Sequence, residues 1–451
     1  MSQSKICVYP WSHVNINPNG DVWPCCHQRG DQMRVYGNFK EDDIDTIFNS
    51  ESARELRRSM LQGVLPRNTC IKCIEYEKIG IKSARDWANQ QPWAKEIIDN
   101  IPNTTKDDGT VENYKIKFWD LRWSNLCNMK CVMCSPDWSS LWVQEIKNKL
   151  ENFDDETIQK DNTLRAYKQQ IKHDTLKIRH LPNKQFIDNH INDVEHIYFA
   201  GGEPLIMDEH WYILNKLTEL KRFNVKIKYN TNMLKMDYKG QNAIDLWKNW
   251  DYLKLSVEGS IDETGKRAEW IRSGTIWETV EKNIKQVRDT GIQTFSNTTV
   301  GCYNVIRLPE LIDELYELYY SPTNKKAQVN LNPIHNYWCS IQVLPDALKR
   351  DILEKTKSWE SKTKSKTNKI EAIYHELQKP HDPDRLKMFW KRSSWLDLNK
   401  DSTLFDHIPE FAELNDQTGN QYEKFRDDWI EKSLSKRNRS IDSNLCSSVS
   451  N

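Results

Sequence analysis

Short apolar runs alternate with longer amphipathic stretches from about residue 110 onward. Six runs rich in β-branched and aromatic residues have the length of strands: 115–123, 196–200, 225–229, 252–257, 293–300 and 328–333. Between them, four stretches have the apolar spacing of helices: 207–220, 243–250, 276–288 and 309–319. Strands that alternate with helices predict βαβ units and a parallel sheet.

This alternation favours a curved parallel sheet over a dinucleotide-binding fold, because no G-x-G-x-x-G turn follows the first strand. We therefore expect an α/β protein with a partial (β/α)6, TIM-like barrel over residues 111–345. In such a fold the active site lies at the carboxyl ends of the strands.

The stretches outside the barrel pattern predict further helices. Residues 136–194 are longer than one connecting helix requires, so they predict a helical insertion. The Lys/Ser/Thr-rich run 355–369 predicts a charged helix end or a linker. Residues 346–451 then form a helical C-terminal extension whose last dozen residues are expected to be a disordered tail.

Residues 1–110 predict a small separate domain that begins with a hairpin. Asn19 and Gly20 stand between two short apolar stretches, 14–16 and 22–23, which is the pattern of a tight β-turn. This domain contains five of the eleven cysteines of the chain.

Composition narrows the class of protein. The chain has 451 residues, 65 basic and 65 acidic side chains and a net charge of +0, which disfavours a nucleic-acid partner. No run approaches the 18 apolar residues of a membrane-spanning helix, and the first residues lack the apolar stretch of a signal peptide. We expect a cytoplasmic protein with no membrane partner, whose cysteines are metal ligands, catalytic groups or free thiols rather than disulfides.

Three cysteines lie within eight residues directly after the first predicted strand. Cys127, Cys131 and Cys134 have the spacing C-x3-C-x2-C. Three thiolates at this spacing can hold three irons of a 4Fe–4S cube, and the fourth iron then stays open for a substrate or cofactor. A zinc knuckle with a distant fourth ligand is the alternative.

This loop resembles the signature of the radical S-adenosylmethionine (radical SAM) superfamily. The Gly201-Gly202-Glu203-Pro204 turn after the second strand resembles the glycine-rich motif of that family. The resemblance implies an enzyme that uses a reduced 4Fe–4S cluster to cleave S-adenosylmethionine into methionine and a 5′-deoxyadenosyl radical. That radical then takes a hydrogen atom from the substrate.

The resemblance also implies a set of residues that bind S-adenosylmethionine. Gly201 and Gly202 let the backbone approach the methionine end, and Glu203 accepts a hydrogen bond from the amino group. Other residues resemble family positions at strand ends and in the following loops; they are Asn232, Ser256, Glu258 and Arg272. Met133 stands where the family often has an aromatic residue near the adenine.

A second metal centre is predicted in the N-terminal domain. Cys7 and Cys25 flank the predicted hairpin, and Cys70 and Cys73 form a C-x-x-C pair. Four thiolates fit either tetrahedral zinc or a fully ligated 4Fe–4S cluster. The pattern resembles the start of the SPASM and twitch auxiliary-cluster domains, and the one-cluster twitch type has the closer cysteine count. The resemblance favours iron–sulfur over zinc, and the spacing favours Cys25 over Cys26 as the ligand.

The sequence therefore predicts a radical SAM oxidoreductase or modifying enzyme with one auxiliary cluster. Peptide or protein modification is the leading substrate class, because auxiliary-cluster members often act on peptides. RNA or a small metabolite is the alternative, and so is a non-catalytic zinc or iron–sulfur protein. The family chemistry implies a small reductant protein, such as a flavodoxin or a ferredoxin, as a partner.

Overall fold

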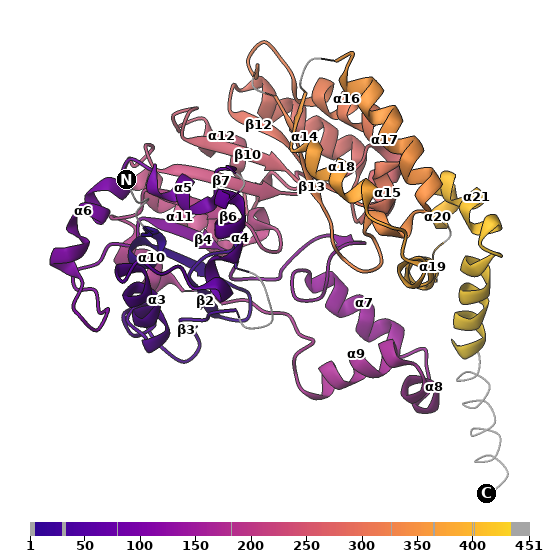
Figure 1. The fold of residues 1–451 in the computed structure, drawn as a ribbon, viewed down its shortest axis with the longest axis horizontal. Helices are drawn as coiled ribbons and strands as arrows, with labels where there is room; N and C mark the ends of the chain where they lie inside the picture. Colours follow the sequence, from indigo (N-terminus) through magenta and orange to yellow (C-terminus); the bar gives the residue numbers. More distant parts are fainter. Residues whose placement is uncertain are drawn as a thin grey trace, which may run out of the picture. The chain divides into compact units, whose positions relative to one another are not determined.

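The computed structural model describes residues 5–28, 33–78, 80–181, 183–325, 327–363, 366–398, 400 and 402–433. They divide into two compact units (Figure 1). Unit 1 comprises Met1–Leu126, Arg179–Thr231 and Asp237–Ser256, and unit 2 comprises Cys127–Ile178, Asn232–Met236 and Val257–Asn451.

All six predicted barrel strands are present. They are β4 (Phe118–Leu121), β6 (His196–Phe199), β7 (Lys226–Thr231), β10 (Leu255–Gly259), β12 (Gln293–Val300) and β13 (Val329–Pro333). β4, β6 and β7 are parallel neighbours in unit 1, and β12 and β13 are parallel neighbours in unit 2. β10 stands between β7 and β12 in the strand order of the sheet. Its first two residues belong to unit 1 and its last three to unit 2. The strands thus follow one another in chain order, which confirms the predicted α/β class and its partial-barrel topology.

The four predicted helices are also confirmed. They are α11 (Asp208–Glu219), α12 (Ala243–Trp247), α14 (Trp277–Asp289) and α16 (Leu308–Tyr319). In unit 2, α14 and α16 pack beside β12 (Figure 1), because the apolar stripe of each helix faces the sheet. Val300, Leu311 and Leu315 are fully buried in this layer.

The predicted hairpin extends the sheet of unit 1. β1 (His13–Ile16) pairs antiparallel with β2 (Asp21–Trp23) and parallel with β4, and β3 (Gly37–Asn38) pairs with β2. Gly20 has a φ of +98° in the turn, and a Cβ there would lie 2.3 Å from Asn38 Oδ1. Glycine is therefore required at this turn for two reasons, its φ and the close approach of Asn38.

One face of the unit 1 sheet is a row of apolar side chains in register. Val14, Trp119, Ile197 and Ile227 are adjacent across β1, β4, β6 and β7, and all four are fully buried. The N-terminal hairpin therefore shares its hydrophobic core with the first barrel strands.

Short helices that the sequence pattern did not predict follow the hairpin in unit 1. They are α2 (Ile44–Phe48), α3 (Glu51–Leu61), α4 (Arg67–Lys78), α5 (Ala84–Asn89) and α6 (Ala94–Thr104), and α1 (Tyr9–Ser12) precedes it. Arg57 on α3 is fully buried and donates to the carbonyl oxygens of Pro10, Phe48 and Gly109. One guanidinium thus connects α3 to three other segments of the N-terminal region.

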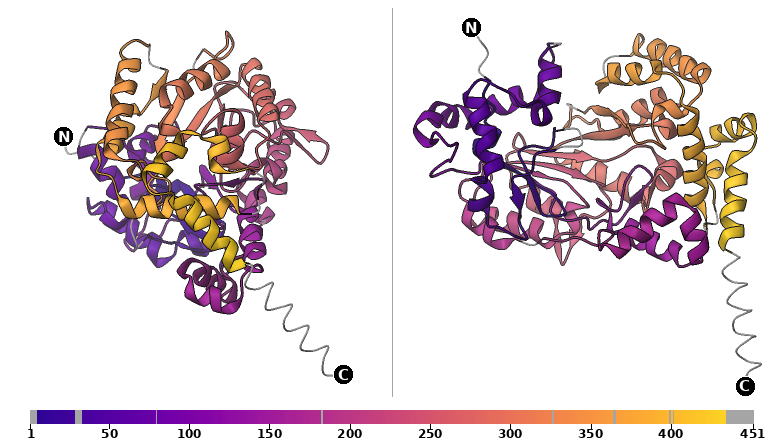
Figure 2. Two further views of the ribbon diagram at one scale, coloured as in Figure 1. Left: turned by 90° about the vertical axis from the view of Figure 1, so that its right-hand side faces the viewer. Right: turned by 60° about the horizontal axis from the view of Figure 1, so that its bottom comes forward.

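The predicted insertion 136–194 contains four helices: α7 (Ser140–Leu150), α8 (Asp155–Lys160), α9 (Asn162–Lys172) and α10 (Lys184–His190). The C-terminal region is helical, as predicted, with α17 (Asp346–Glu360), α18 (Ile370–Gln378), α19 (Pro383–Asp397), α20 (Leu404–His407) and α21 (Glu410–Gln417), orange to yellow in Figure 2. Within the predicted linker, α17 continues to Glu360 and β14 (Thr367–Asn368) pairs with β13. The expected disordered tail lies outside the described residues.

The remaining elements are short. They are β5 (Lys130–Cys131), η1 (Pro204–Ile206), β8 (Asp237–Tyr238), β9 (Gln241–Asn242), α13 (Gly265–Ile271), β11 (Arg272–Ser273), α15 (Cys302–Val305) and η2 (Ile341–Val343). Within the described part of the chain, no helix has the length and apolar character needed to cross a membrane.

We predict that Arg57→Met lowers the free energy of unfolding by about 3 kcal/mol, because three buried carbonyl groups lose a charged donor. Arg58→Met on the same helix is the matched control, since the Arg58 side chain is 32% exposed and pairs with Glu51. We expect the control to cost less than about 1 kcal/mol. Chemical denaturation of both variants measures the difference, and equal losses would contradict the assigned role of Arg57.

Candidate functional site

The three-cysteine loop lies in unit 2 and is anchored at both ends. The Cys127 N–H donates to Ser140 Oγ at 3.2 Å, and Ser139 Oγ donates to the Met129 carbonyl at 2.7 Å. β5, which contains Cys131, pairs antiparallel with β11. The start of α7 and the strand β11 therefore determine the path of this loop.

Arg272 lies directly against the second cysteine. Its Nη1 is 3.6 Å from Cys131 Sγ, and its Nε donates to Asp262 Oδ2 at 2.7 Å. Burial raises the pKa of the Cys131 thiol, and the guanidinium acts in the opposite direction. A cation at this position favours the thiolate form, which is the form that binds iron.

Asn232 also contacts the loop. Its Nδ2 donates to Asn128 Oδ1 at 2.7 Å, and its Oδ1 accepts from the Leu234 N–H at 3.0 Å. Two other residues predicted to bind the cofactor are on β10, where Glu258 is buried in unit 2 and Ser256 is half-buried in unit 1.

The Gly201–Gly202 turn packs in unit 1 against the residues that lead into Cys127. The Gly202 N–H donates to the Ser124 carbonyl at 3.1 Å, and the Glu203 N–H donates to the Leu126 carbonyl at 2.7 Å. A Cβ on Gly202 would lie 2.0 Å from the Leu126 oxygen. Gly201 has a φ of +102°. These glycines are therefore required by a backbone-to-backbone contact, a reason that the sequence pattern did not reveal.

Glu203 is buried at the end of this turn, with 1% of its surface exposed. Its Oε1 accepts from Thr231 Oγ1 at 2.7 Å and from the Leu205 N–H at 3.2 Å, so it caps η1. These contacts orient the carboxylate, because both donors come from rigid elements next to the turn.

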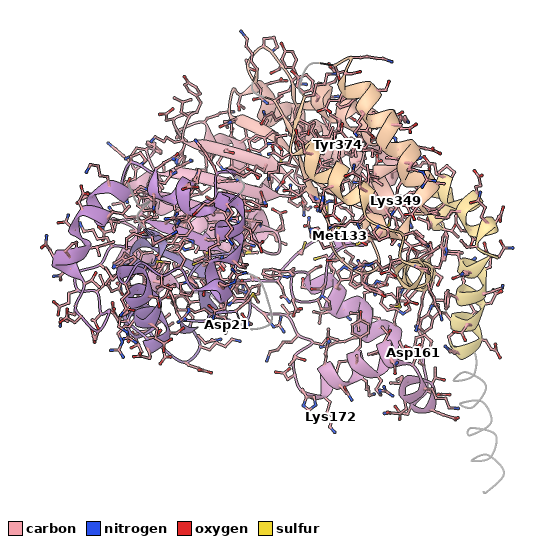
Figure 3. All side chains as sticks on the ribbon, viewed as in Figure 1. Asp21, Met133, Asp161, Lys172, Lys349 and Tyr374 are labelled. Atoms are coloured by element: carbon pink, nitrogen blue, oxygen red, sulfur yellow. The ribbon has the colours of Figure 1, made fainter. Side chains whose placement is uncertain are left out.

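A small apolar pocket lies beside the loop in unit 2, and sequence reasoning found only one of its residues. Met133, labelled in Figure 3, is the predicted one. The pocket has about 210 Å³ of empty space. Its other lining residues come from the end of α13, from β12 and from the segments after β12 and β13; they are Ile271, Thr299, Gly301, Tyr303, Asn304, Ile334 and Cys339. Gly301 is closely packed, since a Cβ there would be 2.3 Å from the Cys339 oxygen.

Three side chains from outside the loop donate to its carbonyl groups. Trp142 Nε1 donates to Cys131 O at 3.0 Å, Trp338 Nε1 to Val132 O at 3.0 Å and Asn336 Nδ2 to Met133 O at 2.6 Å. No motif marks these residues, because their role depends on contacts over as many as 206 positions of sequence.

The four predicted auxiliary cysteines line a single cavity in unit 1. Cys7, Cys25, Cys70 and Cys73 surround about 410 Å³ of empty space together with apolar residues that include Leu56 and Met60. Cys70 and Cys73 are one turn apart on α4, so they lie on the same face of the helix. Cys26 is exposed and is not among the residues that line this cavity.

Burial dominates the electrostatics of this cavity. It raises the pKa of the Cys7 and Cys25 thiols well above the ordinary value and that of Cys70 to about 12. Arg85 also lines the cavity, and its guanidinium pairs with Glu77 at 2.6 Å. These thiols hold their protons at neutral pH, so a metal that binds here must displace them.

The donor set and the cavity both fit an iron–sulfur cluster. Cysteine thiolates are the ligands of such clusters, and four of them converge on a cavity with apolar walls. Within the described ranges, no three Cys, His, Asp or Glu side chains are already arranged around a single metal position. Cys302 and Cys339 are buried free thiols, and Cys446 lies outside the described residues.

Two protein-family models match the chain. Residues 121–315 match the radical SAM superfamily, and residues 7–74 match SPASM, an iron–sulfur cluster-binding domain. The chain therefore contains a radical SAM domain with a SPASM domain before it, which confirms the predicted family and the predicted order of domains. No curated protein sequence matches the chain.

Similar solved structures include SuiB of Streptococcus suis bound to S-adenosylmethionine, at 13% identity over 70% of this chain and 61% of that chain, with a TM-score of 0.36. SuiB bound to its precursor peptide SuiA matches at 11% identity over 70% of this chain and 61% of that chain, with a TM-score of 0.35. In both comparisons the chain spans less than two thirds of the length of SuiB.

We predict that Gly202→Ala lowers the iron content of the protein purified and reconstituted without oxygen, because the added Cβ displaces Leu126 and with it Cys127. Gly63→Ala is the control for the loss of a glycine: its φ of +76° makes alanine costly there as well, but a Cβ at Gly63 meets no atom within 4 Å. Iron per chain and circular dichroism should be measured together. A folded Gly202→Ala protein with the iron content of the control would contradict the role of this turn.

Proposed function

We propose that the chain is a radical SAM enzyme whose reaction begins at the three-cysteine loop. The observation that supports this most strongly is the donor set: three cysteines in one anchored loop, beside an arginine and without a fourth local cysteine. When a reduced 4Fe–4S cluster is bound there, it supplies the electron that cleaves S-adenosylmethionine to methionine and a 5′-deoxyadenosyl radical.

The residues of the chain then have separate tasks. Cys127, Cys131 and Cys134 hold the cluster, and Arg272 stabilises the negative charge of the Cys131 sulfur. Glu203 accepts a hydrogen bond from the amino group of S-adenosylmethionine, in an orientation set by Thr231. The apolar pocket beside Met133 receives the adenine.

The polar residues at the strand ends complete the cofactor site. We assign Ser256 and Glu258 to the ribose, and Arg272 is also available to the methionine carboxylate. Asn232 acts through its hydrogen bond to Asn128 of the loop, so its main task is to position the cysteines.

The SPASM domain holds a second centre in this proposal. Each iron of a 4Fe–4S cube there would have one cysteine ligand, from Cys7, Cys25, Cys70 and Cys73. Because no iron is left open, this centre transfers electrons and does not chelate substrate. A cluster of the one-site twitch type fits this cysteine count. Zinc in the same cavity would instead be a structural site.

We propose a peptide or protein as the substrate, supported by the SPASM match, since auxiliary-cluster members of the superfamily often act on peptides. The net charge of +0 does not favour RNA. A flavodoxin or ferredoxin would supply the electron. Co-expression with a short peptide encoded beside the gene tests the substrate class, and a change in peptide mass that requires Cys127, Cys131 and Cys134 would support it.

We predict that the reduced protein cleaves S-adenosylmethionine to 5′-deoxyadenosine even without substrate. Replacing Cys127, Cys131 and Cys134 together by alanine should abolish this product, while Cys302→Ala, a change at a buried thiol outside the loop, should leave it. Liquid chromatography measures 5′-deoxyadenosine. Equal product from the triple variant and the wild-type protein would exclude the proposed reaction centre.

We also predict that Cys70→Ser with Cys73→Ser leaves 5′-deoxyadenosine formation measurable but stops turnover of the substrate, because the substrate radical then has no electron acceptor. Cys26→Ser is the matched control, since Cys26 does not line the cavity. Metal analysis accompanies the assay. One zinc per wild-type chain, lost in the Cys70/Cys73 variant, would overturn the electron-transfer role.

A further inference from the structure

A cluster of aromatic side chains lies behind the three-cysteine loop, and most of it comes from outside the stretch that matches the radical SAM model. Trp142 on α7, Trp338 after β13 and Trp395 on α19 form this group, here called the tryptophan cluster. Trp142 and Trp395 are buried, with ring centroids 6.1 Å apart and planes inclined by 14°. Two of these three residues lie beyond residue 315, where the matched domain ends.

Arg392 of α19 is in contact with all three indole rings. Its Cζ lies 4.7 Å from the ring centroid of Trp142, 5.5 Å from that of Trp338 and 4.6 Å from that of Trp395. A guanidinium prefers such positions, because its planar charge interacts with the electron-rich ring faces. Among the described residues, no carboxylate forms an ion pair with Arg392.

Two of the three rings that Arg392 contacts also hold the loop. Trp142 donates its indole N–H to Cys131 O, and Trp338 donates its own to Val132 O. These two bonds fix the orientations of two successive peptide planes. Since each peptide plane limits the torsions of its neighbours, the directions of the Cys131 and Cys134 side chains depend on them.

Helix α19 is itself firmly seated in unit 2. Asp397 at its end is fully buried and accepts from Trp270 Nε1 at 2.9 Å and from Tyr422 OH at 2.9 Å. The Lys149 ammonium stacks 4.0 Å from the Trp395 ring centroid and donates to the Trp395 carbonyl. Arg392 therefore extends from a rigid element and not from a loose C-terminal segment.

We propose that Arg392 is a positioning residue for the cluster: it orders Trp142 and Trp338 so that their N–H groups hold the carbonyls of Cys131 and Val132. This inference rests on the proposed function, because it assumes that a cluster binds at the three-cysteine loop. The C-terminal extension then takes part in the reaction centre through side-chain positioning. Groups that orient metal ligands control both the affinity of a site and its reduction potential.

The test compares Arg392→Ala, Arg392→Lys and the wild-type protein after anaerobic reconstitution. Lys387→Ala is the matched control, a lost cation on an exposed position of the same helix. Iron release to a chelator is followed over time, and electron paramagnetic resonance is recorded with and without S-adenosylmethionine. Only the three-cysteine cluster has an open iron, so the signal that changes on addition belongs to it.

We expect Arg392→Ala to release the iron of the responsive cluster about 10-fold faster, the lower end of the usual effect of removing a residue that orients metal ligands. The reduction potential of that cluster should shift, while the other signal stays the same. Arg392→Lys should release iron at a rate between those of the wild-type protein and Arg392→Ala, because a cation remains above the rings but the planar stacking is lost. Rates and potentials equal to those of Lys387→Ala would overturn the proposal.

A second variant keeps the test decisive if Arg392→Ala fails to fold. Trp338→Phe keeps an aromatic ring for Arg392 but removes the donor to Val132 O. It should also accelerate iron release. The double variant with Arg392→Lys should be no worse than the more affected single variant, because both changes act on one chain of contacts. Additive effects would overturn the proposal. A wild-type protein without a responsive cluster would instead reject the proposed function itself.

Discussion

A cluster held by only three protein ligands depends on the backbone that presents them. In the proposed site, three thiolates in one short loop leave one iron to the cofactor, so no fourth side chain of the protein is available to correct their directions. The structure meets this constraint with hydrogen bonds to the loop. Four side chains each donate to one carbonyl of the loop: Ser139 to Met129, Trp142 to Cys131, Trp338 to Val132 and Asn336 to Met133.

The need to fix the backbone that presents the cysteines also explains the two glycines after β6, Gly201 and Gly202. The turn that contains Glu203 must approach the backbone of Ser124 and Leu126 closely, and a methyl group on Gly202 would collide with the Leu126 oxygen. The turn and the residues leading into Cys127 are therefore packed as one piece of unit 1. Gly202 is therefore needed for the backbone path that leads into the cysteine loop, apart from any role in cofactor binding.

The N-terminal domain is joined to the barrel strands by a parallel strand pair. β1 pairs with β4 over four residues, so the hairpin that separates Cys7 from Cys25 continues the sheet of unit 1. α4 then brings Cys70 and Cys73 to the same cavity. A SPASM domain that precedes its radical SAM domain in sequence can thus share a core with it.

Local patterns predicted the barrel well, because each strand is a short apolar run and each helix has a single apolar face. They also predicted the hairpin, because Asn19 and Gly20 form a turn signal between two short apolar stretches. They missed α2–α6, which are only 5 to 12 residues long, and β14, which has only two residues. The loop-holding residues Asn336 and Trp338 could not be predicted, since only the folded chain brings them to the cysteines. Trp142 lies 11 positions after Cys131, but no motif marks its indole N–H as a donor to the loop.

The most direct test of this account is the iron content of anaerobically reconstituted protein, read together with its spectrum before and after S-adenosylmethionine is added. The account predicts about eight iron atoms per chain, as two 4Fe–4S clusters, of which one alone responds to S-adenosylmethionine. Colourless protein that contains zinc and no iron would contradict it, and so would clusters whose spectrum does not change when S-adenosylmethionine is added.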